Sequence, residues 1–213
     1  MTGTMDLRDG LCGDDLFMDL GRCSTGSLED ESTVREIWDR YGRECAVMVL
    51  DSSGFTRGTR NSGIIRHLSC ILGMRRLVQP LLEACSGCTG YRFCTDNVFA
   101  EFESVEEALG TALKVMEAVE AETIGAGEGC TLGVCIGIGF GRVLISGSEG
   151  AFGDQMNLAS KLGEDLAGRG DVLLTREAYL ALPEEQREGA VLMEASVSGV
   201  VFQYYRMLGI RSV

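Results

Sequence analysis

Runs of apolar and polar residues along the chain predict strands in its first half. Residues 45–50 form an unbroken apolar run that ends at Asp51 and Gly54, a pattern typical of a buried strand. Residues 91–102 alternate between apolar and polar positions around Asp96, which predicts a β-hairpin with Asp96 at its tip. Both strand signals therefore end or turn at an aspartate.

Apolar residues at helical spacing mark three further segments. Residues 34–41 predict a short amphipathic lead-in helix, and residues 64–85 predict a longer helix. Residues 105–120 are strongly periodic, and Ser104 before them with Glu107 three residues later forms a capping-box pattern. We therefore expect a helix to begin directly after Ser104.

Glycines interrupt the second half of the chain. Residues 130–145 are apolar but contain Gly137, Gly139 and Gly141, and we interpret them as two strands joined by a turn. A glycine turn then leads into an amphipathic helix at 155–166. The remaining predicted elements are a strand at 172–174, a helix at 176–182, and strands near 190–195 and 200–207.

The order of these elements predicts the fold. A strand, a helix, a hairpin, a helix and a strand match a split βαβ, ferredoxin-like plan, which is an α+β fold with helices packed on a mostly antiparallel sheet. Residues 1–40 are interpreted as an acidic, weakly structured N-terminal extension with the short lead-in helix, because the first 32 residues hold eight acidic residues against two arginines. Residues 41–213 are expected to form one domain.

The charge balance narrows the classes of partner. The chain of 213 residues carries 19 basic and 32 acidic residues, a net charge of −13, which argues against binding to nucleic acid or to an anionic membrane surface. No apolar run approaches the roughly 20 residues that cross a bilayer. The nine cysteines are odd in number and several lie in apolar runs, which favours a reduced, cytoplasmic protein.

Two aspartates and one helix carry the candidate chemistry. In a split βαβ fold the first strand and the hairpin are neighbours, so Asp51 and Asp96 are expected at one end of the sheet. Two carboxylates together with nucleotide phosphates commonly hold Mg²⁺ or Mn²⁺, whereas the alternative is that both aspartates only start turns. Asn157 and Lys161 stand four residues apart on one helix face, where an amide and a cation suit a phosphate or sugar oxygen.

Four sequence blocks carry a family resemblance. They are V-L-D-S-S-G-F-T (49–56), F-C-T-D-N-V-F-A-E-F (93–102), I-G-I-G-F-G-R-V (136–143) and F-G-D-Q-M-N-L-A-S-K-L (152–162). In this order and spacing the chain resembles the catalytic domain of class III adenylyl and guanylyl (nucleotidyl) cyclases, over about residues 43–207. The resemblance implies a cyclase-homology domain at 41–213, a head-to-tail homodimer or pairing with a partner cyclase-like domain, and two-metal conversion of a nucleoside triphosphate to a cyclic monophosphate.

Several site positions of the family are kept. The resemblance implies that Asp51 and Asp96 bind the metal ions and that Asn157 orients the ribose. It also places Arg142 where some members bind the triphosphate. The backbone of the loop that follows the first aspartate would hold phosphates through exposed N–H groups. The residues of this loop are Ser52, Ser53, Gly54, Phe55 and Thr56.

Four positions depart from the family pattern. The purine-reading lysine is replaced by Arg92 and the purine-reading aspartate by Gly150, for which Glu149 could compensate. The transition-state arginine is replaced by Lys161, which keeps the charge but loses the planar donor fork. Ser198 replaces a phosphate-binding lysine. Metal and triphosphate binding are therefore expected to be kept, and base selection and transition-state stabilisation to be weakened.

Three functions remain open from the sequence. The first is a cyclase-like domain that binds ATP, with GTP less favoured, and Mg²⁺ or Mn²⁺ at two sites, cyclises weakly or not at all, and acts as a nucleotide-responsive module. The second is an active adenylyl or guanylyl cyclase, a phosphorus–oxygen lyase that makes cAMP or cGMP and pyrophosphate. The third is a dimerisation scaffold that binds no nucleotide, which does not need two clustered carboxylates.

Overall fold

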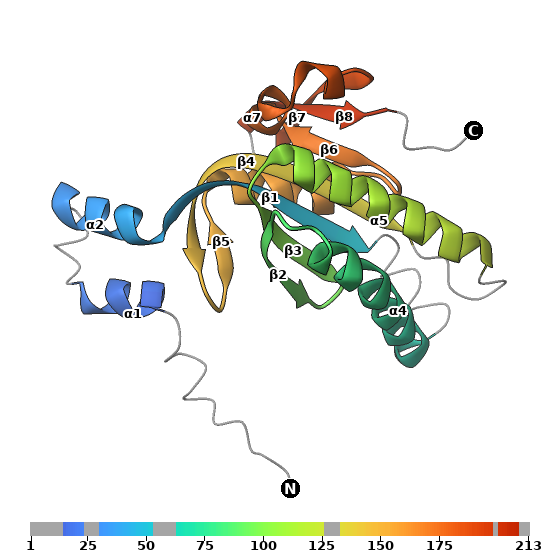
Figure 1. The fold of residues 1–213 in the computed structure, drawn as a ribbon, viewed down its shortest axis with the longest axis horizontal. Coiled ribbons are helices and arrows are strands. Elements are labelled where there is room, and N and C mark those ends of the chain that lie inside the picture. Colours follow the sequence, from blue (N-terminus) through green and yellow to red (C-terminus); the bar gives the residue numbers. More distant parts are fainter. Residues whose placement is uncertain (1–14, 24–29, 53–62, 126–132, 198–199, 209–213) are drawn as a thin grey trace, which may run out of the picture.

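The computed structural model describes residues 15–23, 30–52, 63–125, 133–197 and 200–208. It contains one eight-stranded sheet (Figure 1). The strands are β1 (Gly42–Ser52), β2 (Cys88–Cys94), β3 (Asn97–Phe102), β4 (Val134–Ser146), β5 (Gly150–Phe152), β6 (Val172–Thr175), β7 (Ala190–Val197) and β8 (Val200–Met207).

Helices flank the sheet, and the α-helices other than α1 lie close to positions that the sequence predicts. The α-helices are α1 (Asp15–Arg22), α2 (Glu31–Tyr41), α4 (Ile64–Glu83), α5 (Val105–Gly125), α6 (Asp154–Ser160) and α7 (Arg176–Ala181). A π-helical turn, η3 (Lys161–Leu166), continues α6, and a 3₁₀ turn, η4 (Glu184–Gln186), follows α7. The helix predicted at 155–166 is therefore confirmed, with a change of helix type in its second half.

The strand order confirms the ferredoxin-like plan. It runs β2-β3-β1-β4-β6-β8-β7, and β5 pairs with β4. β4 and β6 are parallel, and the other pairs are antiparallel. β1 therefore lies between β3 and β4 at the centre of the ferredoxin-like core, as expected for its unbroken apolar run.

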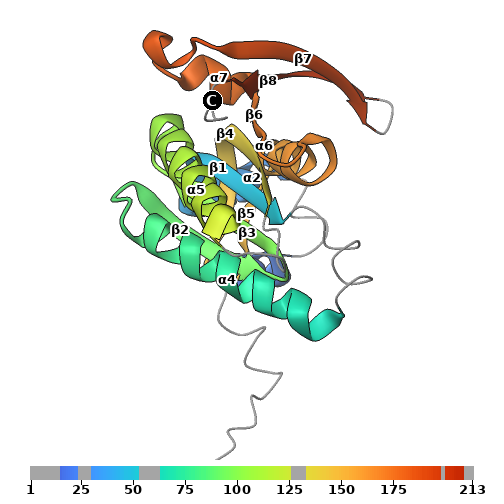
Figure 2. The ribbon, with the colours of Figure 1, turned by 90° about the vertical axis from the view of Figure 1, so that its right-hand side faces the viewer.

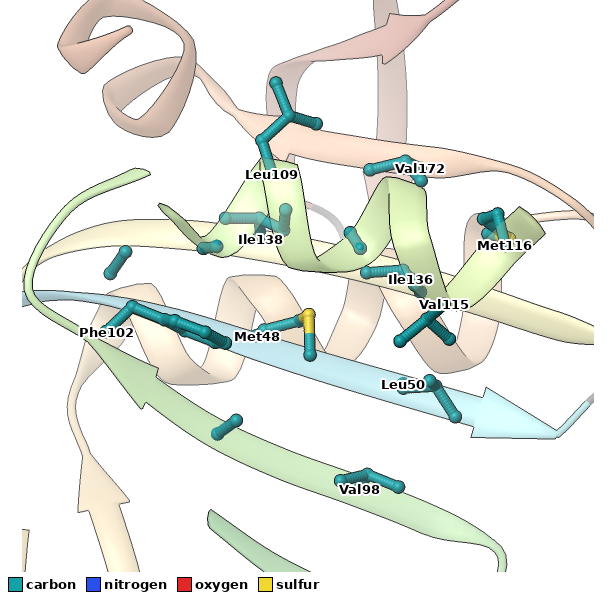
Figure 3. Close-up of a cluster of buried hydrophobic side chains, with 14 of the residues drawn as sticks. Met48, Leu50, Val98, Phe102, Leu109, Val115, Met116, Ile136, Ile138 and Val172 are labelled. Atoms are coloured by element: carbon teal, nitrogen blue, oxygen red, sulfur yellow. The ribbon is translucent and has the colours of Figure 1, made fainter. Parts of the chain in front are cut away.

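The main core lies between the sheet and helices α4, α5 and α7. Met48 and Leu50 of β1 are fully buried there, because alternate residues of a strand point to the same face. Figure 3 shows Leu50 close to Val115 of α5, whereas Leu109 of the same helix points away from β1. Other members of the cluster shown in Figure 3 are Val98, Phe102, Met116, Ile136, Ile138 and Val172.

A second, smaller cluster covers part of the opposite face of the sheet. Val47 and Val49 of β1 pack there with Met156 and Ala159 of α6. Figure 2 shows α5 and α6 on opposite sides of β1 and β4. We call the side that carries α6 the α6 face. Odd-numbered residues of β1, including Asp51, point toward it.

Glycines in β4 allow α6 and η3 to approach the sheet closely. Gly137, Gly139 and Gly141 lie within one continuous strand, so the prediction of two strands joined by a turn is wrong. A Cβ on Gly139 would lie 2.5 Å from the backbone oxygen of Gln155, and a Cβ on Gly137 would lie 2.6 Å from the backbone nitrogen of Gly163. Glycine in a strand interior often marks such a close backbone approach, and alternate spacing puts these glycines on one face.

The predicted cap and hairpin are both confirmed. The Glu107 backbone N–H donates to Ser104 Oγ at 3.2 Å, and this hydroxyl donates to the Glu107 carboxylate at 3.1 Å, so the first turn of α5 is capped. β2 and β3 form the hairpin, and Thr95 at its tip has a left-handed φ of 51°. The Arg75 guanidinium donates to the Thr95 carbonyl and so ties α4 to this tip.

The N-terminal helices pack at the end of the sheet where β1 begins. Figure 1 shows α1 and α2 beyond the start of β1, at the opposite end from its arrowhead. The sequence predicts weakly structured chain before the lead-in helix, and this prediction is wrong for α1. Leu16 of this helix is buried, and Phe17 contacts the Phe152 ring edge-on. Tyr41 Oη donates to the Asp19 carboxylate at 2.7 Å and links α2 to α1.

Two chemical properties complete this description. Most cysteines of the described residues carry free thiols, but Cys70 is disulfide-bonded, so a fully reduced chain, as expected from the sequence, is not what the structure contains. Within the described ranges no helix is both long and apolar enough to cross a membrane.

Candidate functional site

The two predicted metal-binding aspartates lie together at one end of the sheet. Asp51 is the penultimate residue of strand β1, and Asp96 is in the tip between β2 and β3. Ser52 Oγ donates to Asp96 Oδ2 at 3.2 Å, and Thr95 Oγ1 donates to Asp96 Oδ1 at 3.0 Å. The two hydroxyls fix the Asp96 carboxylate beside the end of β1, as the split βαβ plan predicts.

Three carboxylates, those of Asp51, Asp96 and Glu164, lie close enough at this end of the sheet for their charges to interact. Burial, together with the charges of Asp96 and Glu164, raises the pKa of Asp51 to about 6, while a hydrogen bond from the Ser52 backbone N–H opposes the shift. A carboxylate whose pKa is raised by burial and by neighbouring carboxylates is stabilised by any cation placed between them. This crowding of carboxylates argues against the alternative that both aspartates only start turns.

The donor set fits a hard divalent cation. Asp51 and Asp96 supply carboxylate oxygens, and Asn97 Oδ1 is a buried acceptor without a hydrogen-bond partner among the described residues. Mg²⁺ and Mn²⁺ favour such oxygen ligands and complete their shells with substrate phosphates or water. No cluster of three or more His, Cys, Asp or Glu side chains within the described residues forms a metal site by itself.

Glu164 is a further acidic residue at this site that the sequence did not single out. It lies in η3 and acts on the pKa of Asp51, and burial with the charges of Asp165 and Asp96 raises its own pKa. The signal was available, because Glu164 stands seven residues after Asn157 and so lies on the same helical stripe. The close packing of η3 on Gly137 carries Glu164 toward the sheet.

The predicted catalytic positions lie on α6 and η3. Asn157 is exposed on α6. Lys161 begins η3, and its Nζ lies 3.9 Å from the Asp165 carboxylate, with the Lys161 side chain partly exposed and the Asp165 side chain exposed. An exposed pair at this distance is weak, so Lys161 remains available to a phosphate.

The two altered purine-reading positions also lie together. The Arg92 guanidinium lies 3.4 Å from the Glu101 carboxylate and 4.6 Å from the centre of the Phe99 ring. Gly150 has a left-handed φ of 86°, and a Cβ at Gly150 would collide with the Arg92 guanidinium. Arg92 therefore fills the space that a side chain at position 150 would take, and Glu101, which sequence reasoning missed, is its ion-pair partner.

A cavity of about 470 Å³ opens beside this pair. Its volume is within the range of small-ligand sites. Arg92, Glu101 and Gly150 line it, whereas Glu149, which the sequence offered as a compensating residue, is not among the lining residues. Other lining residues include Arg43, Cys45, Thr89, Glu103, Ile145 and Ser146.

Arg142 does not join the two aspartates. In the register of β1 with β4, Arg142 lies opposite Glu44 near the start of β1, whereas Asp51 lies opposite Cys135 near the other end. Its guanidinium lies 4.6 Å from the centre of the Trp38 ring of α2, a cation–π contact. The lead-in helix therefore holds the residue that the resemblance assigns to the triphosphate.

Two predicted parts of the site lie outside the described residues. They are the phosphate loop beyond Ser52, which comprises Ser53, Gly54, Phe55 and Thr56, and the altered position Ser198.

Comparisons with known proteins agree on the fold. No protein-family model and no curated protein matches the chain. Solved structures do match. The guanylyl cyclase Cya2 superposes with a TM-score of 0.69 at 18% identity, over 79% of this chain and 93% of that chain. An adenylate/guanylate cyclase/hydrolase from Silicibacter pomeroyi gives a TM-score of 0.67 at 19% identity, over 79% of this chain and 98% of its own.

A third similar structure was solved with a nucleotide analogue. It is the catalytic core of a rhodopsin-guanylyl cyclase with converted specificity in complex with ATPαS, with a TM-score of 0.63 at 16% identity, over 78% of this chain and 97% of that chain. At these identities the likeness establishes the fold, which is also the fold that the four sequence blocks predict. The chain therefore has the fold of the class III adenylyl and guanylyl cyclase catalytic domains.

Proposed function

We propose that this chain is a nucleotide-responsive, cyclase-like module that binds a nucleoside triphosphate with Mg²⁺ or Mn²⁺ and cyclises it weakly or not at all. The sequence favours ATP over GTP as the nucleotide. The observation that carries the proposal is the convergence of Asp51 and Asp96 at one end of the α6 face. Asp51, Asp96 and the Asn97 side-chain oxygen would hold the metal, which supplies positive charge to the phosphates.

Weak turnover is inferred from the groups that would act on the phosphates. Lys161 offers a point charge instead of the bidentate fork of arginine, and it already has Asp165 as a neighbour. Arg142 is held by Trp38. Losing one preorganised transition-state donor costs about 100- to 1000-fold in rate, so the altered residues weaken catalysis more than binding.

The second candidate is an active cyclase, and one observation favours it. Arg92, which stands at one of the positions that read the base in the related family, pairs with Glu101 beside the cavity. A module that had lost its ligand would not need a buried charged pair there, because such pairs are costly to bury.

Head-to-tail pairing of two chains is part of the proposal. On the α6 face, Glu101 pairs with Val47 of β1, four residues before Asp51. We call the end of the α6 face at Asp51 the carboxylate end and the end at Glu101 and Arg92 the base end. At about 3.3 Å per residue, roughly 13 Å separate the two ends within one chain. Two antiparallel copies would set the carboxylate end of one chain against the base end of the other.

A thermal-shift experiment tests nucleotide binding. ATP or GTP with Mn²⁺, at about 100 times its Kd, should stabilise the folded chain by about 2.7 kcal/mol, which is a rise in Tm of about 5–11 °C for a chain of this length. The double variant Asp51→Asn with Asp96→Asn should lose the shift. Relief of the carboxylate repulsion can raise the Tm of this variant by itself, so the ligand-induced shift is compared and not the Tm.

The matched control is Asp39→Asn, which removes one exposed carboxylate of α2 and should keep the full shift. If neither nucleotide shifts the Tm of the unsubstituted chain, the proposal and the active-cyclase alternative both fall, and the scaffold remains.

Turnover is tested by measuring cyclic nucleotide made by the purified chain with Mn²⁺. Robust production would overturn the weak-cyclase proposal in favour of the active enzyme. Lys161→Arg should raise any residual rate, because it restores the donor fork. Gly150→Asp is not a useful companion, because its Cβ would collide with Arg92 and the left-handed φ would be strained.

A further inference from the structure

The base end of the α6 face is organised by a residue that has no counterpart in the predicted site. Glu101 is buried, with about a tenth of its side chain exposed, yet it lines the cavity. Its neighbours along β3, Ala100 and Phe102, point into the main core on the other face. The strand therefore delivers a single carboxylate to the wall of the cavity, and a buried carboxylate is costly unless something uses it or pairs with it.

Two partners hold Glu101 in one orientation. The Arg92 guanidinium lies 3.4 Å from its Oε1, and the backbone N–H groups of Ala151 and of Glu101 itself donate to the carboxylate. A Cβ on Gly90 would lie 2.8 Å from Glu101 Oε2, so glycine at position 90 leaves the space that this oxygen occupies. These contacts use only part of the four lone-pair sites of a carboxylate.

Arg92 is fixed by contacts on several sides. Its guanidinium lies over the Phe99 ring, contacts Glu101, and fills the volume that a side chain at Gly150 would need. The contact with Glu101 is single and not bidentate, so Arg92 keeps N–H donors for a ligand. The residues at positions 150 and 92 are thus sterically coupled.

A ligand that fits this wall must offer donors to Glu101 and acceptors to Arg92 side by side. Guanine presents the N1–H and N2–H₂ donors next to the O6 acceptor, with N7 beyond it, and arginine pairs well with O6 and N7. Adenine presents one amino donor beside ring-nitrogen acceptors, so a carboxylate gains only one hydrogen bond from it.

We propose that Glu101 is the base-reading residue of this chain, that Arg92 positions it, and that the pair selects guanine over adenine nucleotides. The proposal rests on the proposed function, since it assigns the base of the same nucleotide. It differs from the preference for ATP over GTP expected from the sequence alone. One additional hydrogen bond to a charged group predicts a preference of roughly 10-fold or more.

The test is calorimetric titration with Mn²⁺ and the α,β-methylene analogues of GTP and ATP, in which the bond that cyclisation breaks is blocked. It is carried out at mildly alkaline pH, because burial raises the pKa of Glu101 and a higher pH favours its ionised form. The GTP analogue should bind roughly 10-fold more tightly than the ATP analogue. This ratio needs no variant, so it tests the selectivity even where substitutions impair folding.

The substitution Glu101→Gln separates a reading role from a structural one. The amide keeps the shape but presents its own N–H₂ to the guanine donors, so the GTP analogue should lose roughly 10-fold in affinity while the ATP analogue changes little. Loss of structural support alone would weaken both analogues together. Glu117→Gln removes an exposed charge from α5 and should leave both affinities unchanged.

Each outcome is decisive. Binding of the ATP analogue as tightly as the GTP analogue, or equal losses of both in Glu101→Gln, overturns the selectivity while leaving nucleotide binding in place. Failure of both analogues to bind the unsubstituted chain overturns the proposed function itself.

Discussion

Adding one methyl group at Gly137 should separate α6 and η3 from the sheet. Gly137 lies in β4 where η3 crosses it, and a Cβ there would collide with the Ala159 carbonyl and lie 2.6 Å from the Gly163 nitrogen and 3.0 Å from Leu162 Cβ. The variant Gly137→Ala therefore forces the helix away from the strand.

The size of the effect follows from these distances. Non-bonded carbon contacts are most favourable at about 3.5–4.0 Å, so the helix must retreat by roughly 1 Å. Overpacking a core costs about 1–3 kcal/mol when side chains can adjust. The neighbours here include backbone atoms, so we expect the upper end, about 3 kcal/mol, which corresponds to a fall in Tm of about 6–12 °C.

Urea unfolding measures this change as a lower midpoint with an unchanged slope. The matched control is Gly110→Ala in α5, where an added Cβ meets nothing within 4 Å. That variant should gain about 0.4–1 kcal/mol, because alanine restricts the unfolded chain and favours helix.

A loss of less than about 1 kcal/mol in Gly137→Ala, below the usual range for overpacking, would refute the close approach of α6 to β4. The same variant should weaken nucleotide binding, because Asn157 and Lys161 ride on the displaced helix. Intact binding with lowered stability would show that these two residues do not depend on the position of α6.

Two further predictions concern buried polar groups. Thr175 Oγ1 accepts from the Ala178 N–H at 3.2 Å and donates to Gln155 Oε1 at 2.8 Å. Thr175→Val should therefore lower the free energy of unfolding, measured in urea, by about 1–3 kcal/mol. Thr175→Ser keeps the hydroxyl and should keep most of this stability, so equal losses in the two variants would contradict the hydroxyl's role. Burial raises the pKa of Cys45 and of Cys135 to about 11, so iodoacetamide on the folded chain should label the exposed Cys94 first by mass spectrometry, and equally rapid labelling of all three would contradict their burial.

The fold was predictable because its signals are local or periodic. The apolar run before Asp51 can be satisfied only by burial on both faces, and the alternation around Asp96 defines a hairpin. Their meeting at one sheet end follows from the order of elements. The roles assigned to these aspartates stay predictions, although their proximity is now part of the structure.

What the sequence could not reveal depends on contacts between distant segments. Glycine at alternate positions is compatible with a turn or with a close crossing, and only the position of α6 decides between them. Likewise, Arg92 reads as a simple replacement of lysine until Gly150 and Glu101 are seen beside it. The structural role of each of these residues depends on the space available beside a residue that is distant in the sequence.

The central position of β1 also has a consequence for how the chain folds. Ala46 pairs with Phe102, 56 residues later, and with Phe140, 94 residues later. Contacts so distant in sequence slow folding, because the intervening loops must close first. During synthesis at about 5–20 residues per second, the most apolar strand waits roughly 5–20 s for its second neighbour. The carboxylate end of the site therefore has its complete support only after β4 has been made, and until then β1 is a segment for chaperones to protect.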